Sequence, residues 1–249
     1  MNMNLRLKEI AESADTDFYG VADLALAHDA ILAQGGQSLA AFPRAISVGI
    51  ALPNAIVDEL PRRDDRRVAT NYRHHCYDVI NARLDQLTSR LSTALQRQGF
   101  RALPIPASRR VDDERLCGAF SHKLAAHLAG LGWIGKSCLL VTPQVGPRAR
   151  WATVLTDAPL PVTGKPLEER CCNCDECVQI CPVRAFTGEP FRESEPREKR
   201  YDAGKCDRYF AALRKKDAET AVCGLCLYVC PQGAQNPPHA GSTTAIGRQ

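Results

Sequence analysis

The sequence lacks the long hydrophobic runs that membrane proteins need. No stretch approaches the ~18 consecutive apolar residues of a membrane-spanning helix. The first residues, MNMNLRLKEIAESAD, contain no apolar block of the kind found in a secretory signal. We therefore expect a cytoplasmic protein with no membrane partner, whose cysteine thiols stay reduced.

Proline and glycine are not in excess either. The 16 prolines and 17 glycines among 249 residues are ordinary in number, which excludes a collagen-like or low-complexity chain over most of its length. With 45% hydrophobic and 24% charged residues, the chain can bury a core and form one large domain or two modest ones.

The surplus of positive charge is small and lies early in the chain. The formal net charge is +4. From Glu168 to the end there are 12 basic and 12 acidic residues, which leaves 20 basic and 16 acidic residues before it. Arginine clusters usually solvate a surface; the alternative is an anionic partner such as RNA or a phosphate-bearing cofactor. The clustered arginines are Arg62, Arg63, Arg66, Arg67, Arg109 and Arg110.

Alternation of apolar and small residues predicts strands. The clearest case is AISVGIAL, residues 45–52, which we expect to be a strand half-buried against a core. The prolines of FRALPIPAS cannot donate to a ladder, so this segment is expected at a sheet edge. The expected strands are 18–22, 46–52, 100–108 and 149–157.

Helical spacing of apolar residues appears in three places. Residues 5–12 carry a short pattern, and apolar residues between Tyr77 and Gln98 recur every three or four positions on one face. Gly99 can terminate this longer helix. Residues 119–142 predict a helix, a glycine-rich turn and a strand.

The 12 cysteines need an explanation other than disulfides. Reduced cysteines are buried apolar residues, catalysts or metal ligands. Residues 171–182 form C-x2-C-x2-C-x3-C-P, in which three thiolates hold one iron-sulfur cube and the fourth reaches another. Residues 223–231 repeat C-x2-C-x3-C-P without its first cysteine, which Cys206 can supply.

Two 4Fe-4S clusters with crossed ligation follow from these motifs. Two zinc sites are the alternative, but zinc ribbons use separated C-x2-C pairs and give no reason for the third thiol or the trailing proline. Cys172 is left unassigned, and Cys76, Cys117 and Cys138 are interpreted as small, partly buried hydrophobic residues. The expected ligands are Cys171, Cys174, Cys177 and Cys230 for the first cluster, and Cys181, Cys206, Cys223 and Cys226 for the second.

A domain boundary is expected near Pro166. Prolines and polar residues interrupt every periodic pattern in APLPVTGKPLEER, and the composition turns cysteine-rich beyond it. We expect an α+β protein, with an N-terminal α/β sandwich-like domain in residues 1–165 and a C-terminal ferredoxin-like double 4Fe-4S cluster domain in residues 166–249. Residues 237–249 are expected to be a frayed tail.

The glycine-rich turn satisfies G-x-G-x-x-G in the wrong context for a dinucleotide. That fingerprint needs a strand before the glycines and a helix after them, and here the order is reversed. The turn still indicates close approach of the backbone to a neighbouring strand or a flat ligand. The residues concerned are Gly130, Gly132, Trp133, Gly135 and Lys136.

Two further polar groups are candidate sites. His122 and His127 lie five positions apart, which places them on different helix faces and disfavours a shared metal. His122 could donate a proton near the glycine turn, or form an ordinary surface pair with Lys123. Tyr72 belongs to a polar-aromatic group before the long helix, where Asn71 is expected to cap; this group could also be an interface between layers.

The segments AGLGWIGK, LLVT and VLTD, joined to the cysteine run, resemble the epoxyqueuosine reductase family. The likeness covers nearly the whole chain, including the FYGVA segment, the strand AISVGIAL and a YxxHCY stretch that enters a long helix. Many ferredoxins share the cysteine motif, whereas the glycine loop joined to it is far more specific. These enzymes are also similar in plan to reductive dehalogenases.

The resemblance implies a cobalamin-binding α/β domain beside the double 4Fe-4S domain, with the corrinoid at the glycine turn. Family members reduce an epoxide in a tRNA wobble nucleoside. Two departures stand out. The family aspartate of a D-x-x-P segment is matched by Leu116, with Ala119 for the proline, and Asp112 and Asp113 are out of register. The chain also stops soon after its last cysteine, without the C-terminal helical repeats of the longer enzymes.

We therefore expect an iron-sulfur oxidoreductase whose clusters pass single electrons to a bound corrinoid, for reductive cleavage of a small or nucleoside substrate. The expected proton donors are His122 and Tyr72. A ferredoxin or flavodoxin is the expected reducing partner, and tRNA or a small molecule the expected substrate. The alternative is a ferredoxin-like electron-transfer or reductive activator protein without its own substrate; a tRNA-binding module would rest on the arginine clusters alone.

Overall fold

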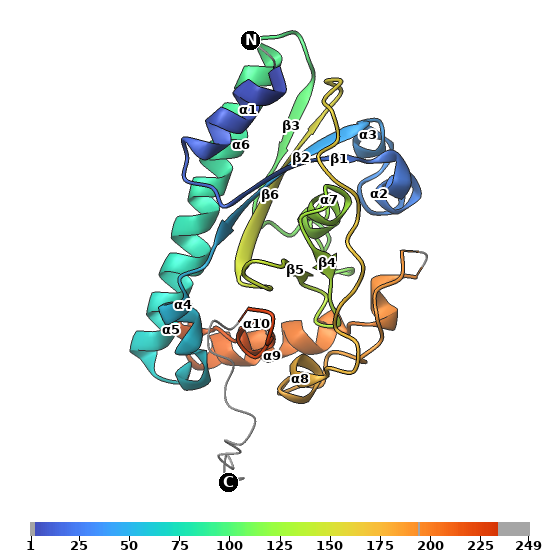
Figure 1. The fold of residues 1–249 in the computed structure, drawn as a ribbon. Coiled ribbons are helices and arrows are strands. Elements are labelled where there is room, and N and C mark those ends of the chain that lie inside the picture. Colours follow the sequence, from blue (N-terminus) through green and yellow to red (C-terminus); the bar gives the residue numbers. More distant parts are fainter. Residues whose placement is uncertain (1–2, 194, 234–249) are drawn as a thin grey trace.

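A four-stranded antiparallel sheet forms the centre of the computed structural model, which describes residues 3–193 and 195–233 (Figure 1). The strand order is β1-β2-β6-β3. All four expected strands are present, and the strand with prolines lies at an edge, as predicted. The expected tail at 237–249 lies outside the described residues. The strands are β1 (Phe18–Asp23), β2 (Arg44–Ala51), β3 (Ala102–Ile105) and β6 (Ala149–Thr156).

The prediction that the strand in AISVGIAL is half-buried was wrong. Its residues from Ala45 to Ile50 are all buried, because β2 is a central strand with helices on both faces of the sheet. Ile46 and Val48 pack into one apolar cluster, and Ala45 packs into the cluster on the opposite face. The small residues between the large ones leave room for this second layer rather than facing water.

Helices cover the two faces of the sheet, as Figure 1 shows. The helices α1 (Met3–Glu12) and α6 (Ile80–Gln96) pack on one face, where Leu7 and Leu84 are fully buried. The opposite face carries α2 (His28–Gly35), α3 (Gln37–Ala40) and α7 (His122–Leu128). This layered sandwich of helices and sheet confirms the α+β class.

The long helix begins within a continuous helical segment. The helix α5 (Arg66–Arg73) runs into a π-helical turn (His74–Val79) and then into α6. Asn71 therefore lies inside α5, and its prediction as a cap was wrong; Asp65 caps α5 by accepting a hydrogen bond from the Arg67 backbone N–H. Tyr72 lies in α5, and Tyr77 lies in the π-helical turn that follows it.

Short elements gather beyond the end of the sheet that lies away from the N-terminus (Figure 1). No helix in the described ranges is long and apolar enough to cross a membrane. The remaining helices are α4 (Asn54–Asp58), α8 (Glu176–Gln179), α9 (Ala203–Lys216) and α10 (Leu225–Tyr228). The 3-10 turns are Ala25–Ala27, Leu60–Arg62, Arg197–Lys199 and Ala218–Thr220. A hairpin is formed by the short strands β4 (Trp133–Ile134) and β5 (Leu140–Val141).

The cysteine-rich segment shares a hydrophobic core with the sheet layers. Val222 and Leu227 are buried in the same cluster as the apolar face of α6. Gly224 adopts a left-handed backbone, with φ of 70°, and a Cβ there would lie 2.8 Å from Leu60 and 3.0 Å from the Tyr72 hydroxyl. Glycine at this position thus allows the loop between Cys223 and Cys226 to press against the N-terminal part of the chain.

Candidate functional site

The first set of cysteines converges although one member is distant in sequence. Burial is the largest cause that raises the pKa of Cys177 to about 12, followed by the negative charges of Cys171, Cys230 and Cys174. The pKa of Cys230 is likewise raised, first by burial and then by Cys174. The structure therefore brings together the four thiols that the sequence assigns to the first cluster.

The second set converges in the same way. Burial raises the pKa of Cys226 most, and the charges of Cys223, Cys206, Cys177 and Cys181 raise it further, so one neighbour, Cys177, comes from the first set. The pKa of Cys206 is raised, first by burial and also by the charge of Cys181, while a hydrogen bond from the Tyr201 hydroxyl favours its thiolate. Cys181 thus faces the second set although it adjoins the first motif in sequence, which is the arrangement that crossed ligation requires.

Thiolates, not thiols, bind metal, so these raised pKa values mean that cluster binding would displace protons from both sets. Within residues 3–193 and 195–233, no three Cys, His, Asp or Glu side chains lie close enough together to hold a single metal ion. The assignment of these cysteines to two clusters therefore stays a prediction.

The glycine turn contacts the first cysteine loop. The Lys136 Nζ donates hydrogen bonds to the carbonyl oxygens of Cys172 and Cys174, at 2.8 and 3.2 Å, and pairs with the Asp175 carboxylate at 2.9 Å. A Cβ on Gly135 would lie 3.2 Å from the Cys171 sulfur. The turn thus packs directly against the loop from Cys171 to Asp175.

Trp133 belongs to the same contact. Its side chain is buried, and the guanidinium of Arg170 lies 5.7 Å from its ring centroid. Its Nε1–H meets the geometry of a full hydrogen bond with none of the described residues. The pKa of Cys171 is raised to about 11, first by burial and then by Glu169. The Trp133 side chain acts in the opposite direction, because it favours the Cys171 thiolate.

The other two glycines allow close passage of the backbone. A Cβ on Gly130, which has φ of 78°, would lie 2.8 Å from the Lys165 carbonyl oxygen, and one on Gly132 would collide with the Val141 carbonyl. The cavities of about 780 and 920 Å³ described below are lined by none of Gly130, Gly132, Trp133, Gly135 and Lys136. Of the two readings for this turn, the structure thus favours approach to neighbouring chain over approach to a flat ligand.

A cavity of about 920 Å³ lies between the start of α6, α9 and the loops 105–111 and 116–122; we call it the central cavity. Asp207 and Val222 line it, and each is the immediate neighbour of a cysteine of the second set, Cys206 and Cys223. The central cavity is therefore the large space that borders the residues of the second cysteine set.

His122 lies in the wall of the central cavity with both ring nitrogens occupied. Its Nε2–H donates to the Pro106 carbonyl at 3.0 Å, and Nδ1 accepts from the Thr153 hydroxyl at 2.9 Å. Burial lowers its pKa, so the ring is neutral. His122 is thus a positioned wall residue. His127 instead bonds the Gly132 carbonyl at 3.0 Å, away from His122.

Tyr72 is buried and does not line the central cavity. Its pKa is raised well above the usual value by burial. Tyr77 does line the cavity; its ring lies 5.8 Å from that of Tyr72, and the Arg150 guanidinium stacks 4.1 Å from its centroid. Sequence reasoning chose Tyr72 over Tyr77, whereas the structure places Tyr77, five positions further along the helical segment, at the cavity wall.

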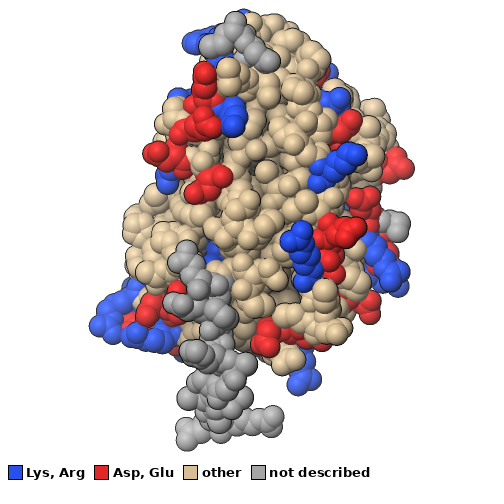
Figure 2. Space-filling view, viewed as in Figure 1, with Lys and Arg blue, Asp and Glu red and all other residues tan. Residues whose placement is uncertain are grey.

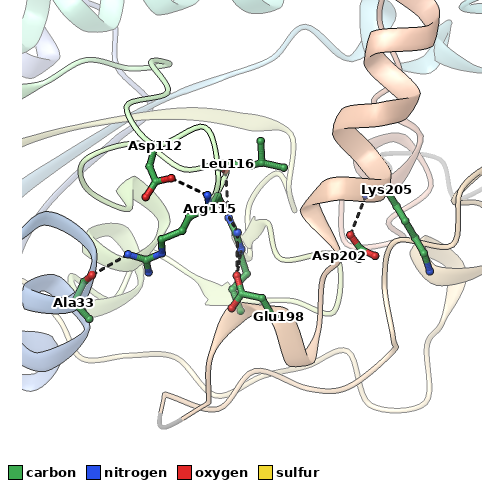
Figure 3. Close-up of polar contacts among 8 residues, drawn as sticks. Ala33, Asp112, Arg115, Leu116, Glu198, Asp202 and Lys205 are labelled. Atoms are coloured by element: carbon green, nitrogen blue, oxygen red, sulfur yellow. Dashed lines mark hydrogen bonds and ion pairs between the residues drawn. The ribbon is translucent and has the colours of Figure 1, made fainter.

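The loop that carries Leu116 also borders the central cavity. Figure 3 shows the polar contacts of this loop, which include those of Asp112 and Arg115. Leu116 has a left-handed backbone with φ of 51°, and its carbonyl accepts a hydrogen bond from Arg197 at 3.3 Å. Arg115 fixes the loop further by donating to the Ala33 carbonyl at 2.8 Å. The position matched to the family aspartate is thus at the cavity wall, but it carries an apolar side chain.

The arginine clusters are largely paired within the molecule. Arg110 pairs with Asp207 at 2.6 Å, and Arg67 with Asp65 at 2.7 Å. Figure 2 shows basic and acidic side chains intermingled on the face in view. These contacts favour the interpretation of the clusters as a solvated surface.

Comparisons with known proteins define the class. Residues 170–233 match the family model of a 4Fe-4S double cluster binding domain. Epoxyqueuosine reductase of Pseudomonas aeruginosa is 31% identical over 165 residues, which cover 62% of this chain and 40% of that protein. The tetrachloroethene reductive dehalogenase of Sulfurospirillum multivorans is 34% identical over 110 residues, 41% of this chain and 22% of the other.

Solved structures share the fold. A catabolic reductive dehalogenase in complex with 3-bromo-4-hydroxybenzoic acid matches with a TM-score of 0.65 at 18% identity, over 93% of this chain and 32% of its own. Epoxyqueuosine reductase from Bacillus subtilis matches with a TM-score of 0.58 at 19% identity, over 96% of this chain and 68% of its own.

The chain thus contains, in residues 170–233, a segment that matches double-cluster iron-sulfur domains. More particularly, the resemblance to epoxyqueuosine reductases and, in plan, to reductive dehalogenases is confirmed. The chain spans about half the length, or less, of the curated relatives it matches.

Proposed function

We propose that this chain is an iron-sulfur reductase in which two 4Fe-4S clusters deliver single electrons to a corrinoid in the central cavity, for reductive cleavage of a small or nucleoside substrate. One observation carries the proposal. The central cavity is walled by Asp207 and Val222, the direct neighbours of two cysteines of the second set. A cluster held there would lie beside the cavity, which is the arrangement that electron delivery needs.

The cavity suits a large, mostly apolar ring with polar substituents. Its volume of about 920 Å³ lies near the upper end of the range for small-molecule sites. Ile105, Val111 and Phe210 offer apolar surface, while Asn81 and Asp85 offer polar groups. These residues fit a corrinoid, whose cobalt supplies the one-electron chemistry and the bond cleavage that protein side chains cannot.

The residues of this chain would shape the site and supply a proton. His122 stays neutral and joins the cavity wall to Pro106 and Thr153. Tyr77 lines the cavity, and its hydroxyl has no hydrogen bond to any described residue. We therefore assign proton delivery to Tyr77 in place of Tyr72.

The remaining assignments extend this proposal. We assign corrinoid binding to residues 1–165 and cluster binding to residues 166–249. The proposed electron donor is a ferredoxin or flavodoxin. The proposed location is the cytoplasm, where thiols stay reduced. One structural neighbour is described with an epoxyqueuosine-modified tRNA stem loop. A modified nucleoside of tRNA or a small molecule is the proposed substrate of this chain.

An electron-transfer or activator protein without its own substrate is the second candidate. Leu116 favours it, because an apolar side chain at this wall position cannot donate the proton that the family aspartate is taken to supply. The two candidates differ in whether the central cavity binds a corrinoid.

Anaerobic purification followed by iron, sulfide and cobalamin-binding analysis tests the proposal. We expect about eight iron atoms per chain, from two cubes, and saturable cobalamin binding. Ala82 is exposed on α6 and lines the cavity, so Ala82→Trp should block cobalamin binding and leave iron unchanged. Ser89→Trp, also exposed on α6 but outside the cavity lining, is the matched control.

Two outcomes would count against it. Full cluster content without any cobalamin binding would favour the electron carrier. Two zinc ions and no sulfide in an anaerobic preparation would remove the cluster assignment altogether.

A further inference from the structure

A second large cavity lies on the other side of the loop that carries Leu116. Its volume is about 780 Å³, and we call it the lateral cavity. Three segments form its walls: 25–34 around α2, 115–124 at the start of α7, and 191–200 from the cysteine-rich part. Nothing in the proposed electron path uses this space.

Arg200 is the unusual residue in its wall. The residue is 5% exposed, and its Nε and Nη1 are fully buried without a hydrogen-bond partner. Among the residues that the structure describes, no carboxylate lies within ion-pair distance of its guanidinium. The guanidinium carbon lies 4.5 Å from the centroid of the Phe191 ring. A buried cation with this little compensation is costly unless an anion joins it.

The acidic residues of the cavity are already engaged elsewhere. Glu198 pairs with Arg197 at 3.0 Å, and Glu193 lies 3.8 Å from His127. The other two pairs are Glu195 with Arg192 and Asp29 with His28. None of these four carboxylates compensates Arg200.

Lys123 adds a second cation to the same wall. Its Nζ donates to the Cys138 carbonyl at 2.7 Å, a neutral acceptor that leaves the charge uncompensated. Burial, the largest cause, lowers its pKa, and the nearby Arg200 and Arg197 lower it further. Two cations that disfavour each other at one cavity wall are the expected setting for a bound anion.

We propose that the lateral cavity binds a small organic oxyanion, a carboxylate or a phosphate, with Arg200 as its main donor and Lys123 as the second cation. The guanidinium presents donors in a planar fork that matches both kinds of oxyanion. Phe120, Leu124 and Phe191 provide apolar walls for the body of the ligand. The cavity volume lies in the range of small-molecule sites.

Calorimetric titration of the holoprotein tests this site. Inorganic phosphate and benzoate are titrated in separate experiments, both in chloride buffer. We expect saturable binding of at least one probe, and the better probe tells phosphate from carboxylate chemistry. Arg200→Gln should weaken binding about tenfold or more, because a charge-assisted contact is lost. Arg192→Gln removes the same charge from a side chain that is 64% exposed and outside the cavity lining, and should leave binding unchanged.

The wild-type titration decides the proposal even if Arg200→Gln does not fold. Absence of saturable binding of both probes to the wild-type holoprotein would overturn it, as would equal losses in Arg200→Gln and Arg192→Gln. Binding that persists in Ala82→Trp supports a site separate from the central cavity. This result separates the fate of the anion site from that of the corrinoid proposal.

Discussion

Adding a single methyl group at Gly135 should weaken the first cluster selectively. The new Cβ would lie 3.0 Å from a methyl carbon of Val141 and 3.2 Å from the Cys171 sulfur. Ordinary contacts between such atoms are about 3.5–4.0 Å, so one neighbour must move by a few tenths of an ångström. A sulfur that ligates iron cannot yield without distorting its bond to the metal.

Overpacking of this size costs about 1–3 kcal/mol. If the cost falls on the bound first cluster, its release should become about tenfold faster or more, since 1.4 kcal/mol corresponds to a factor of ten. Iron release into a chelator under mild oxidation measures this directly. We expect two kinetic phases of about four iron atoms each, of which Gly135→Ala accelerates one.

Gly36→Ala is the matched control. A Cβ there meets nothing within 4 Å, but φ is 77°, so alanine strains the backbone far from the cysteines. This variant should lower the free energy of unfolding by about 1–2 kcal/mol and leave both iron-release phases unchanged. The reasoning fails if Gly135→Ala leaves both phases as in wild type, or accelerates both equally.

Three further results are expected. Cys181→Ser should disturb the cluster of the second set in spectra of the reduced protein and spare the first; loss of the first alone would contradict crossed ligation. Burial lowers the pKa of His122 below its usual 6.5. The unfolded state therefore binds a proton at a pH at which the folded ring stays neutral, and the free energy of unfolding should fall as pH drops below about 6.5. Chemical denaturation of His122→Gln should show a weaker dependence in that range, and an unchanged slope would count against the assignment. Leu87 lies on the buried face of α6 and is 1% exposed, so Leu87→Ala should lower the free energy of unfolding by about 2–5 kcal/mol in the same assay. A loss under about 1 kcal/mol would mean that the surrounding core collapses into the space left.

Sequence patterns predicted the parts of this molecule that depend on neighbours along the chain. The strand order could not be read from them, but the strands themselves, the edge position of β3 and the long helix could. The crossed grouping of the cysteines stays a prediction, made from the position of each proline and the spacing of each thiol, which limit the cube that a sulfur can reach. In the structure the charge of Cys230 acts on Cys177, and the charges of both Cys177 and Cys181 act on Cys226.

Contacts between distant segments account for what the sequence could not predict. Nothing in the glycine turn reveals that Lys136 reaches the carbonyls of Cys172 and Cys174. The choice between Tyr72 and Tyr77 depends on which of them the packing of distant segments leaves at the cavity, where Tyr77 lies beside residues of α9. Arg200 is one arginine among many until the fold buries it without a partner.

The core shared by the sheet layers and the cysteine-rich segment sets an order for making this protein. Synthesis proceeds from the N-terminus, and the apolar face around α6 stays partly uncovered until Val222 and Leu227 have been added. Those residues flank the loop between Cys223 and Cys226, which crosses the core at Gly224. The segment that closes the core is therefore also the one that positions the second set of cysteines, so the last part of the chain to be made serves both the packing of α6 and the placement of these thiols.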